Sequence, residues 1–372
     1  MMMKRRTALK LGAAAAASLA APRLALAQSD VVKIGAVAPK TGPLAGGATV
    51  TQWPNVALWA NEVNAKGGLM VDGGQRMVEV VEYDDQTNPG ETIKAVQRLA
   101  TQDNADFIIA PYGTGFNIAA APLFDRYKYP HLAVSAITDQ IEDLSGKFSG
   151  MFFLLGSTTA FVSGVVDVLK GMQEAGTLTG NKIAMVNVAD AFGIELAAAA
   201  RPLFDAAGFE IVYDTSYPLG TQDLSPVMKG AKAAQPNAFV AWSYPPDTFG
   251  LTEQAIIEDL QVEAYYTAVA TCFPAFGGRF GPASNGILGA GGSNPDDAKF
   301  KAYAAAHMEV TGNAPDGWAS ATTYASLQIL EQSIAAVGLD REGVTEHIRA
   351  NTFDTVLGDM NFNANNFNEK FW

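Results

Sequence analysis

The sequence predicts an α/β protein made of two lobes, each a doubly wound parallel sheet. Short, nearly continuous apolar strands alternate with helical segments along most of the chain, which is typical of parallel sheets covered by helices on both faces. The alternation restarts near residue 151 with units of similar size. Removing a 27-residue export signal from the 372 residues leaves 345, more than one hydrophobic core usually serves.

The N-terminus has the pattern of a secretory signal. Basic residues 4–6 precede an apolar, alanine-rich stretch over 11–26, and small residues at Ala25 and Ala27 suit a signal peptidase. Residues 5–10, RRTALK, also match a twin-arginine export signal. We therefore expect cleavage after Ala27 and release into the periplasm.

A membrane anchor is the alternative interpretation of this segment. Pro22 and Arg23 interrupt the apolar stretch, which is shorter than the ~20 residues needed to span a bilayer. Cys272 is the only cysteine, so no internal disulfide is expected and no cysteine at the cleavage site can carry a lipid. Its isolation from the histidines favours a small buried side chain over a nucleophile.

The charge of the chain excludes some partners. The net charge is −13, and the signal carries five basic residues, so the mature chain is near −18. Such a surface repels nucleic-acid phosphates and anionic lipid. We therefore expect no nucleic-acid partner. We also expect the protein to be a monomer.

The first run of β-α units extends to residue 134. Strands are predicted at 31–38, 78–83, 107–110 and 131–134, with helices at 52–66, 89–102 and 117–127. Pro89 at the first helical position and Glu91 in the first turn support the second helix.

The second run begins at residue 151 and is followed by a helical region. Strands are predicted at 151–155, 182–188, 210–217 and 238–242, with helices at 161–175, 194–207, 224–234 and 248–260. A Gly/Pro-rich stretch over 276–295 then separates this run from helices at 296–311, 317–337 and 341–350.

The sequence offers little catalytic or metal-binding chemistry. His131, His307 and His347 stand alone, without a zinc pattern or a partner base. Residues 113–115 lack the third glycine of a dinucleotide loop. The Asp84–Asp85 pair is more typical of a loop or helix cap than of a metal site. We expect no enzyme activity, no metal and no cofactor.

Residues after four strands could instead form a binding site. Ligands of open α/β sheets bind outside the carboxyl ends of the strands. One run offers hydroxyl and amide donors there, and the other offers aromatic side chains. The candidates are Tyr112, Thr114, Ser135, Thr138, Phe192 and Tyr244. This asymmetry suits a small carboxylate with an apolar tail.

Five stretches of the chain resemble the leucine/isoleucine/valine-type (type I) periplasmic binding proteins of ABC transporters. They are IGAVAPKTGPLA at 34–45, NEVNAKGG at 61–68, YDDQTNP at 83–89, DAFG at 190–193 and YPLGTQDLS at 217–225. The resemblance implies two lobes joined by a three-strand hinge, closure on a ligand and delivery to an inner-membrane permease. It places lobe 1 at 28–154 plus 275–352, and lobe 2 at 155–274 plus 353–372.

The resemblance also assigns candidate ligand residues. Thr114 is similar to the hydroxyl position that binds the ligand carboxylate. Ser135 and Ala136 lie in a loop that offers hydroxyl and backbone contacts, Phe192 stands where tyrosine is common, and Tyr244 matches an aromatic position. The whole candidate set is Tyr112, Thr114, Ser135, Ala136, Thr138, Phe192, Tyr244 and Thr271.

Three features depart from the resemblance. Gly47 stands where an aromatic residue is common, and segment 268–272 has no acid for a ligand ammonium. A buried ammonium without a counter-charge is costly, so aromatic and other carboxylic acids remain alternatives to a branched-chain amino acid. The chain stops at Phe371–Trp372, where such proteins usually continue through another strand. A ligand-sensing module and an α/β oxidoreductase are the other functions considered.

Overall fold

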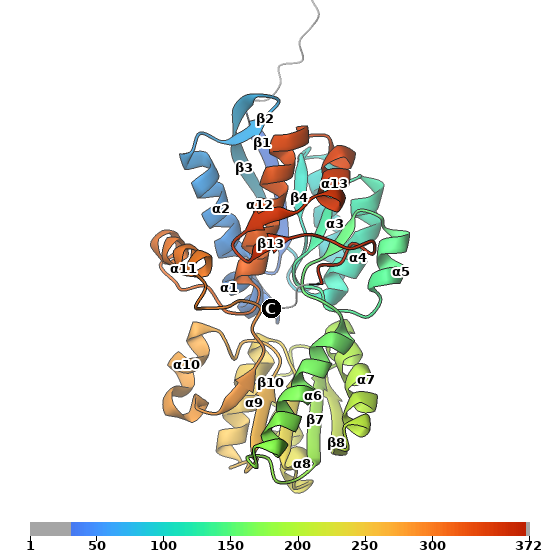
Figure 1. Cartoon of the computed structure of the whole chain (residues 1–372), viewed down its shortest axis with the longest axis vertical. Helices are drawn as coiled ribbons and strands as arrows, with labels where there is room; N and C mark the ends of the chain where they lie inside the picture. The colour runs from blue at the N-terminus through green and yellow to red at the C-terminus, as the bar shows by residue number, and fades with distance from the viewer. Residues whose placement is uncertain (1–30, 370–372) are drawn as a thin grey trace, which may run out of the picture. The chain divides into compact units, whose positions relative to one another are not determined.

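The computed structural model describes residues 31–369, whose two larger sheets consist mainly of parallel strands and are covered by helices (Figure 1). The predicted signal and its cleavage site lie outside the described residues. We call residues 31–155 and 292–369 the first lobe, and residues 156–291 the second lobe. The predicted α/β fold class with parallel sheets is confirmed.

The first lobe is built around strand β1, whose residues are buried on both faces. β1 (Val31–Ala38) lies between β3 (Gly74–Asp84) and β4 (Phe107–Ile109) and is parallel to both. The short β2 (Leu69–Val71) is antiparallel to β3. β5 (His131–Ala133) and β6 (Met151–Phe153) form a separate parallel pair. Because helices cover both faces, β1 is apolar almost throughout.

Helices from both ends of the described chain cover the first lobe. They are α1 (Ala45–Thr51), α2 (Trp53–Ala65), α3 (Pro89–Thr101), α4 (Thr114–Arg126), α5 (Ile141–Lys147), α11 (Ala298–Thr311), α12 (Ser320–Val337) and α13 (Arg341–Ala350). Helix α12 packs against α2 (Figure 1). There the Trp59 Nε1 donates a hydrogen bond to Glu331 Oε2 at 3.0 Å. This contact joins distant parts of the sequence.

The second lobe is one five-stranded parallel sheet in the order β11-β10-β9-β7-β8. Its strands are β7 (Lys182–Val188), β8 (Glu210–Tyr217), β9 (Ala238–Trp242), β10 (Ala264–Thr267) and β11 (Ile287–Gly289). Its helices are α6 (Thr158–Glu174), α7 (Ala191–Ala206), α8 (Ser225–Ala233), α9 (Pro245–Ile257), α10 (Pro274–Phe280) and a 3₁₀ turn at Gly281–Ser284. Helix α7 packs along β7 and β8 (Figure 1).

The boundaries between the lobes differ from the predicted ones at two places. β11 pairs with β10, so residues 275–291, expected in the first lobe, lie in the second. The hairpin β12 (Phe353–Thr355) and β13 (Gly358–Met360) packs on α12, with Phe353 and Met360 buried in the first core. Residues 353–369 therefore join the first lobe and not the second. Alternating apolar residues do not reveal which of two cores a terminal hairpin joins.

The chain passes between the lobes twice within residues 31–369. The first passage follows β6 and leads into α6, and the second follows β11 and leads toward α11. No helix in the same range has both the length and the apolarity to cross a membrane.

Several helices begin about three residues earlier than their apolar periodicity predicts. Helix α4 begins at Thr114 and not at 117, α7 at Ala191 and not at 194, and α9 at Pro245 and not at 248. The first turns carry small or polar residues, so the periodic signal starts late. The predicted binding loops are therefore helix N-termini.

Candidate functional site

Helices α4, α7 and α9 begin just after the carboxyl ends of strands β4, β7 and β9. Their N-termini lie at the boundary between the lobes. Helix α4 is preceded by Gly113, whose φ of 96° lies in the region that favours glycine. No side chain caps this helix, so its first-turn N–H groups are available to an anion. Helices α7 and α9 are instead capped by their own acids, Asp190 and Asp247.

The N-terminus of α4 lies directly against the second lobe. A Cβ placed on Gly115 would lie 3.6 Å from Ala191 Cβ, and one on Gly113 would lie 3.5 Å from Tyr244 Oη. Helix α1 makes a similar approach, because a Cβ on Gly46 would lie 3.7 Å from Pro246 Cγ. Glycines thus allow the backbone of the first lobe to approach α7 and α9 closely.

Aromatic side chains from both lobes surround this point. Phe192 and Tyr244 stack with ring centroids 4.8 Å apart, and both are buried. Tyr112 is also buried and comes from the first lobe. A Cβ on Gly47 would lie 2.2 Å from the Tyr112 hydroxyl. The tyrosine therefore fills the space next to Gly47, the position where an aromatic side chain was expected.

The two predicted carboxylate-binding hydroxyls bond within their own lobe. Thr114 Oγ1 accepts from Ile137 N at 3.1 Å and lies 3.3 Å from Ile137 O, to which it donates. Ser135 Oγ accepts from Gly113 N at 2.8 Å and donates to Pro111 O at 3.3 Å. These bonds fix the loops on either side of the α4 N-terminus. The α4 backbone N–H groups therefore become the principal donors available for a carboxylate.

Of the remaining candidates, Ala136 lies in the same loop as Ser135. Thr138 and Thr271 form hydrogen bonds with residues outside the aromatic cluster. Ala136 is fully buried beside Ser135. Thr138 Oγ1 donates to Glu195 Oε2 at 2.6 Å. Thr271 Oγ1 hydrogen-bonds Thr267 Oγ1 at 2.6 Å within the second lobe. The structure thus brings together Tyr112, Thr114, Phe192 and Tyr244, with Ser135 and Ala136 behind the α4 N-terminus.

Two acids near this cluster, the buried Asp247 and the partly exposed Asp190, were not among the predicted site residues. Burial raises the pKa of Asp190, whose carboxylate lies beside the Tyr244 hydroxyl. Burial, with a smaller contribution from the charge of Asp190, raises the pKa of Asp247 to about 7, although the hydrogen bond from Tyr244 N–H lowers it. Neither acid is in an ion pair within residues 31–369. Each acid also accepts a backbone N–H at the start of its helix, Asp190 from Gly193 and Asp247 from Tyr244.

The pKa values of the tyrosines next to these acids are also raised. Burial raises the pKa of Tyr244 well above its usual value, and the neighbouring Asp190 charge adds to the effect. Burial likewise raises the pKa of Tyr217, with Asp247 the next contributor. Both phenols therefore stay protonated, and the Tyr244 hydroxyl can act as a donor at the lobe boundary.

The acids and histidines that the sequence assigned to structure bond locally. Asp84 accepts from Lys40 N at 2.8 Å and Thr41 Oγ1 at 2.7 Å, and Asp85 accepts from Thr92 Oγ1 at 3.0 Å. These bonds hold the loop after β1 against the loop after β3. His131 Nε2 pairs with Asn117 Oδ1 at 2.9 Å, and burial lowers the pKa of His131 to about 3.

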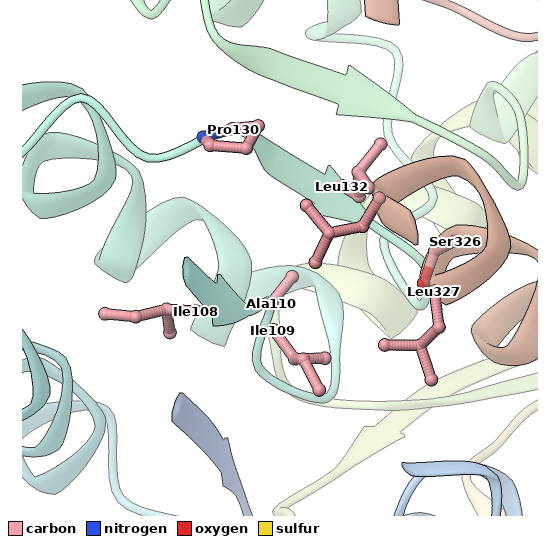
Figure 2. A pocket seen from close by; sticks show the side chains of 8 residues that line it. Ile108, Ile109, Ala110, Pro130, Leu132, Ser326 and Leu327 are labelled. Atoms are coloured by element: carbon pink, nitrogen blue, oxygen red, sulfur yellow. The ribbon is translucent and has the colours of Figure 1, made fainter. Parts of the chain in front are cut away.

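Two hollows lie away from the aromatic cluster. An apolar cavity of about 10 Å³ lies inside the first lobe, and Figure 2 shows Ile109, Leu132 and Leu327 around it. It holds at most one water molecule. A surface groove of about 420 Å³ lies on the second lobe between α7 and β8, beside Arg201 and Asp214. Neither hollow is lined by a predicted ligand residue.

Comparison with known proteins gives one consistent family. A model of the family "Periplasmic binding protein" matches residues 31–369. The chain is 24% identical over 361 residues to Leu/Ile/Val-binding protein homolog 7 of Brucella abortus, covering 91% of this chain and 87% of that protein.

Solved structures share the fold. The branched-chain amino acid transporter substrate binding protein LivJ of Streptococcus pneumoniae, in complex with isoleucine, superposes with a TM-score of 0.78 at 20% identity, covering 91% of this chain and 93% of that one. A solute binding protein of Rhodopseudomonas palustris BisB5, in complex with 3,4-dihydroxy benzoic acid, gives 0.77 at 20% identity and 91% coverage of both chains.

Proposed function

Because the chain belongs to the periplasmic binding protein family, we propose that it captures a small carboxylate between its lobes and delivers it to an ABC permease. The chain is a substrate-binding protein of a transporter family and not an enzyme. Residues 1–27 would direct export, and the mature protein would act in the periplasm as a monomer.

The observation that carries this proposal is the uncapped N-terminus of α4 at the lobe boundary. Its free N–H groups and the positive end of the helix dipole attract an anion. Tyr244 brings a protonated hydroxyl to within reach of Gly113 from the opposite lobe. A carboxylate at this point would therefore interact with both lobes, which links binding to hinge closure.

The apolar part of the ligand would contact the stacked Phe192 and Tyr244 rings. This pair suits a branched aliphatic chain or an aromatic ring equally. One solved relative is in complex with isoleucine and another with 3,4-dihydroxy benzoic acid, and both ligand classes remain open for this chain.

The decisive difference between these classes is the amine. Segment 268–272 supplies no acid, but Asp190 lies beside Tyr244 and provides a negative group in the second lobe. An ammonium near Asp190 would find a counter-charge there, whereas a plain carboxylate would make no favourable ionic contact with Asp190.

A thermal-shift screen with matched ligands tests the proposal. A ligand that binds only the folded state raises the Tm. The chain without residues 1–27 is mixed with L-leucine and 4-methylpentanoate, which differ only in the amine, and with L-phenylalanine and 3-phenylpropanoate, another such pair. We expect at least one pair member to raise the Tm by a few degrees.

The set of compounds that raise the Tm identifies the chemical class of the ligand. Stabilisation by the amino acids alone assigns the ammonium to the site, and stabilisation by the amine-free acids assigns a plain carboxylate. Benzoate and 3,4-dihydroxybenzoate extend the screen to shorter aromatic acids, and the alcohol 4-methylpentanol controls for the carboxylate. Stabilisation by the alcohol as strong as that by the acid would contradict a site built on α4.

A further inference from the structure

Three successive side chains of the first lobe hydrogen-bond to helices of the second. Thr138 Oγ1 donates to Glu195 Oε2 at 2.6 Å, and Gln140 Nε2 donates to Glu195 Oε1 at 2.6 Å. Between them, Asp139 accepts from Thr159 N at 2.9 Å and from Thr159 Oγ1 at 2.7 Å. The segment 138–140 is thus tied to both α6 and α7.

The two ties lie at different places relative to the passage between the lobes. Ile137 pairs with Gly156 beside the first passage, and Thr159 follows three residues later. The Asp139–Thr159 bonds therefore lie close to the pivot of any lobe rotation. Glu195 lies in the first turns of α7, where Gly115 of α4 meets Ala191. Its bonds cross the boundary between the lobes at the side of the proposed ligand site.

The chemistry of Glu195 suits a reversible tie. Its two carboxylate oxygens each accept one hydrogen bond, from the buried Thr138 and from the exposed Gln140. Hydrogen bonds to a charged acceptor are among the stronger ones in proteins. Separation of the lobes would break both bonds at once. Because Glu195 is partly exposed, water could then replace the lost hydrogen bonds.

We propose that Glu195, with Thr138 and Gln140, forms an interlobe clasp that favours the closed arrangement and slows ligand release. Glu195 is a positioning residue, because it acts on the lobes and bonds to groups outside the aromatic cluster. The slowing of release rests on the proposed function, but the effect on lobe closure does not. Thr138, predicted from the sequence to bind ligand, contributes to the clasp.

Small-angle X-ray scattering of the ligand-free protein tests the clasp without any ligand. Glu195→Ala is expected to give a larger radius of gyration than the wild type, because the closed arrangement loses two charged hydrogen bonds. Glu195→Gln keeps one acceptor for Thr138 and is expected to lie between them. Gln140→Ala removes an exposed side chain, leaves the folded core intact and is also expected to open the lobes partly.

Glu263→Ala is the matched control. Glu263 accepts hydrogen bonds from Thr179 N at 2.8 Å and from Thr179 Oγ1, but both residues lie in the second lobe. Its loss is expected to leave the radius of gyration unchanged. Equal radii for the wild type, Glu195→Ala and Gln140→Ala, all folded by circular dichroism, would overturn the proposal.

Stopped-flow displacement of a bound ligand adds the kinetic test. L-leucine or 4-methylpentanoate serves as the probe, according to which one raises the Tm. Glu195→Ala is expected to release it about tenfold faster, with a smaller effect on association. If no carboxylate of the screen binds but the radii differ as expected, the proposed function fails and the clasp stands. Unchanged release from Glu195→Ala would overturn its role in ligand retention.

Discussion

Gly47 and Tyr112 show how one residue compensates for another at the site. A Cβ on Gly47 would lie 2.2 Å from the Tyr112 hydroxyl and 2.6 Å from its Cζ, distances that side-chain rotation alone relieves poorly. The sequence identified Gly47 as a departure from an aromatic position. It could not show that a phenol from 65 positions further along the chain enters the same space, because sequence separation carries no spatial distance.

The pair predicts a non-additive effect of substitution. Gly47→Ala is expected to destabilise the protein by about 1–3 kcal/mol, as overpacking does, and to weaken ligand binding. Tyr112→Ala alone also costs stability because Tyr112 is buried, but the double variant should lose less than the sum of the two single variants, since the clashing ring is gone. Urea unfolding of the single and double variants measures the coupling.

The control for this cycle is Gly146→Ala in α5, where a new Cβ meets nothing within 4 Å. This variant should be neutral or slightly more stable. Additive effects of Gly47→Ala and Tyr112→Ala would contradict the shared space.

Asp247 predicts a pH-dependent stability. Its pKa of about 7 in the fold exceeds the usual 3.8 of the unfolded chain, so the native state holds more protons between these values. The free energy of unfolding therefore falls as pH rises from 4 through 7. Asp247→Asn stays neutral and lacks this contribution. The Tm of the wild type minus that of the variant is expected to decrease by a few degrees from pH 5 to pH 8.

Differential scanning calorimetry of both proteins across this range measures the difference. Asp85, whose pKa burial raises to about 6, is common to both proteins, so its contribution cancels. Parallel profiles of Tm against pH would show that the Asp247 carboxyl is ionised in the fold.

At the scale of helices and strands, the sequence located most elements and missed the short ones. The long amphipathic helices and the apolar strands β1, β7, β8 and β9 lie where they were predicted. Helices α1, α5 and α10 have seven residues each, too few for a clear period. The early start of α4 mattered most, because it changed Thr114 from a loop hydroxyl into the first residue of an uncapped helix.

Removing one buried side chain of helix α12 is expected to lower the free energy of unfolding strongly. Leu327 is buried and lies against the small apolar cavity of the first lobe (Figure 2). Leu327→Ala would enlarge that cavity and is expected to cost about 2–5 kcal/mol. Val337→Ala, at the exposed end of the same helix, should cost far less. Chemical denaturation compares the two, and equal losses would contradict the packing described.

At the scale of the whole molecule, the sequence predicted two parallel-sheet lobes but not all of their boundaries. The repeated β-α units predicted both sheets. The segments 275–291 and 353–369 were expected in the opposite lobes, because short strands such as β11 and β12 have no pattern that specifies a partner. The Glu195 clasp was also invisible, since its bonds join residues of different lobes.

The first core contains residues from both ends of the described chain, with Val32 and Ile34 packed in the same cluster as Phe353 and Met360. During synthesis on the ribosome, the second lobe's sheet is complete once β11 has emerged. The first lobe must wait for the terminal hairpin and close a loop of roughly 300 residues, which slows folding. The core of the first lobe is therefore completed only after the hairpin β12–β13 has been synthesised.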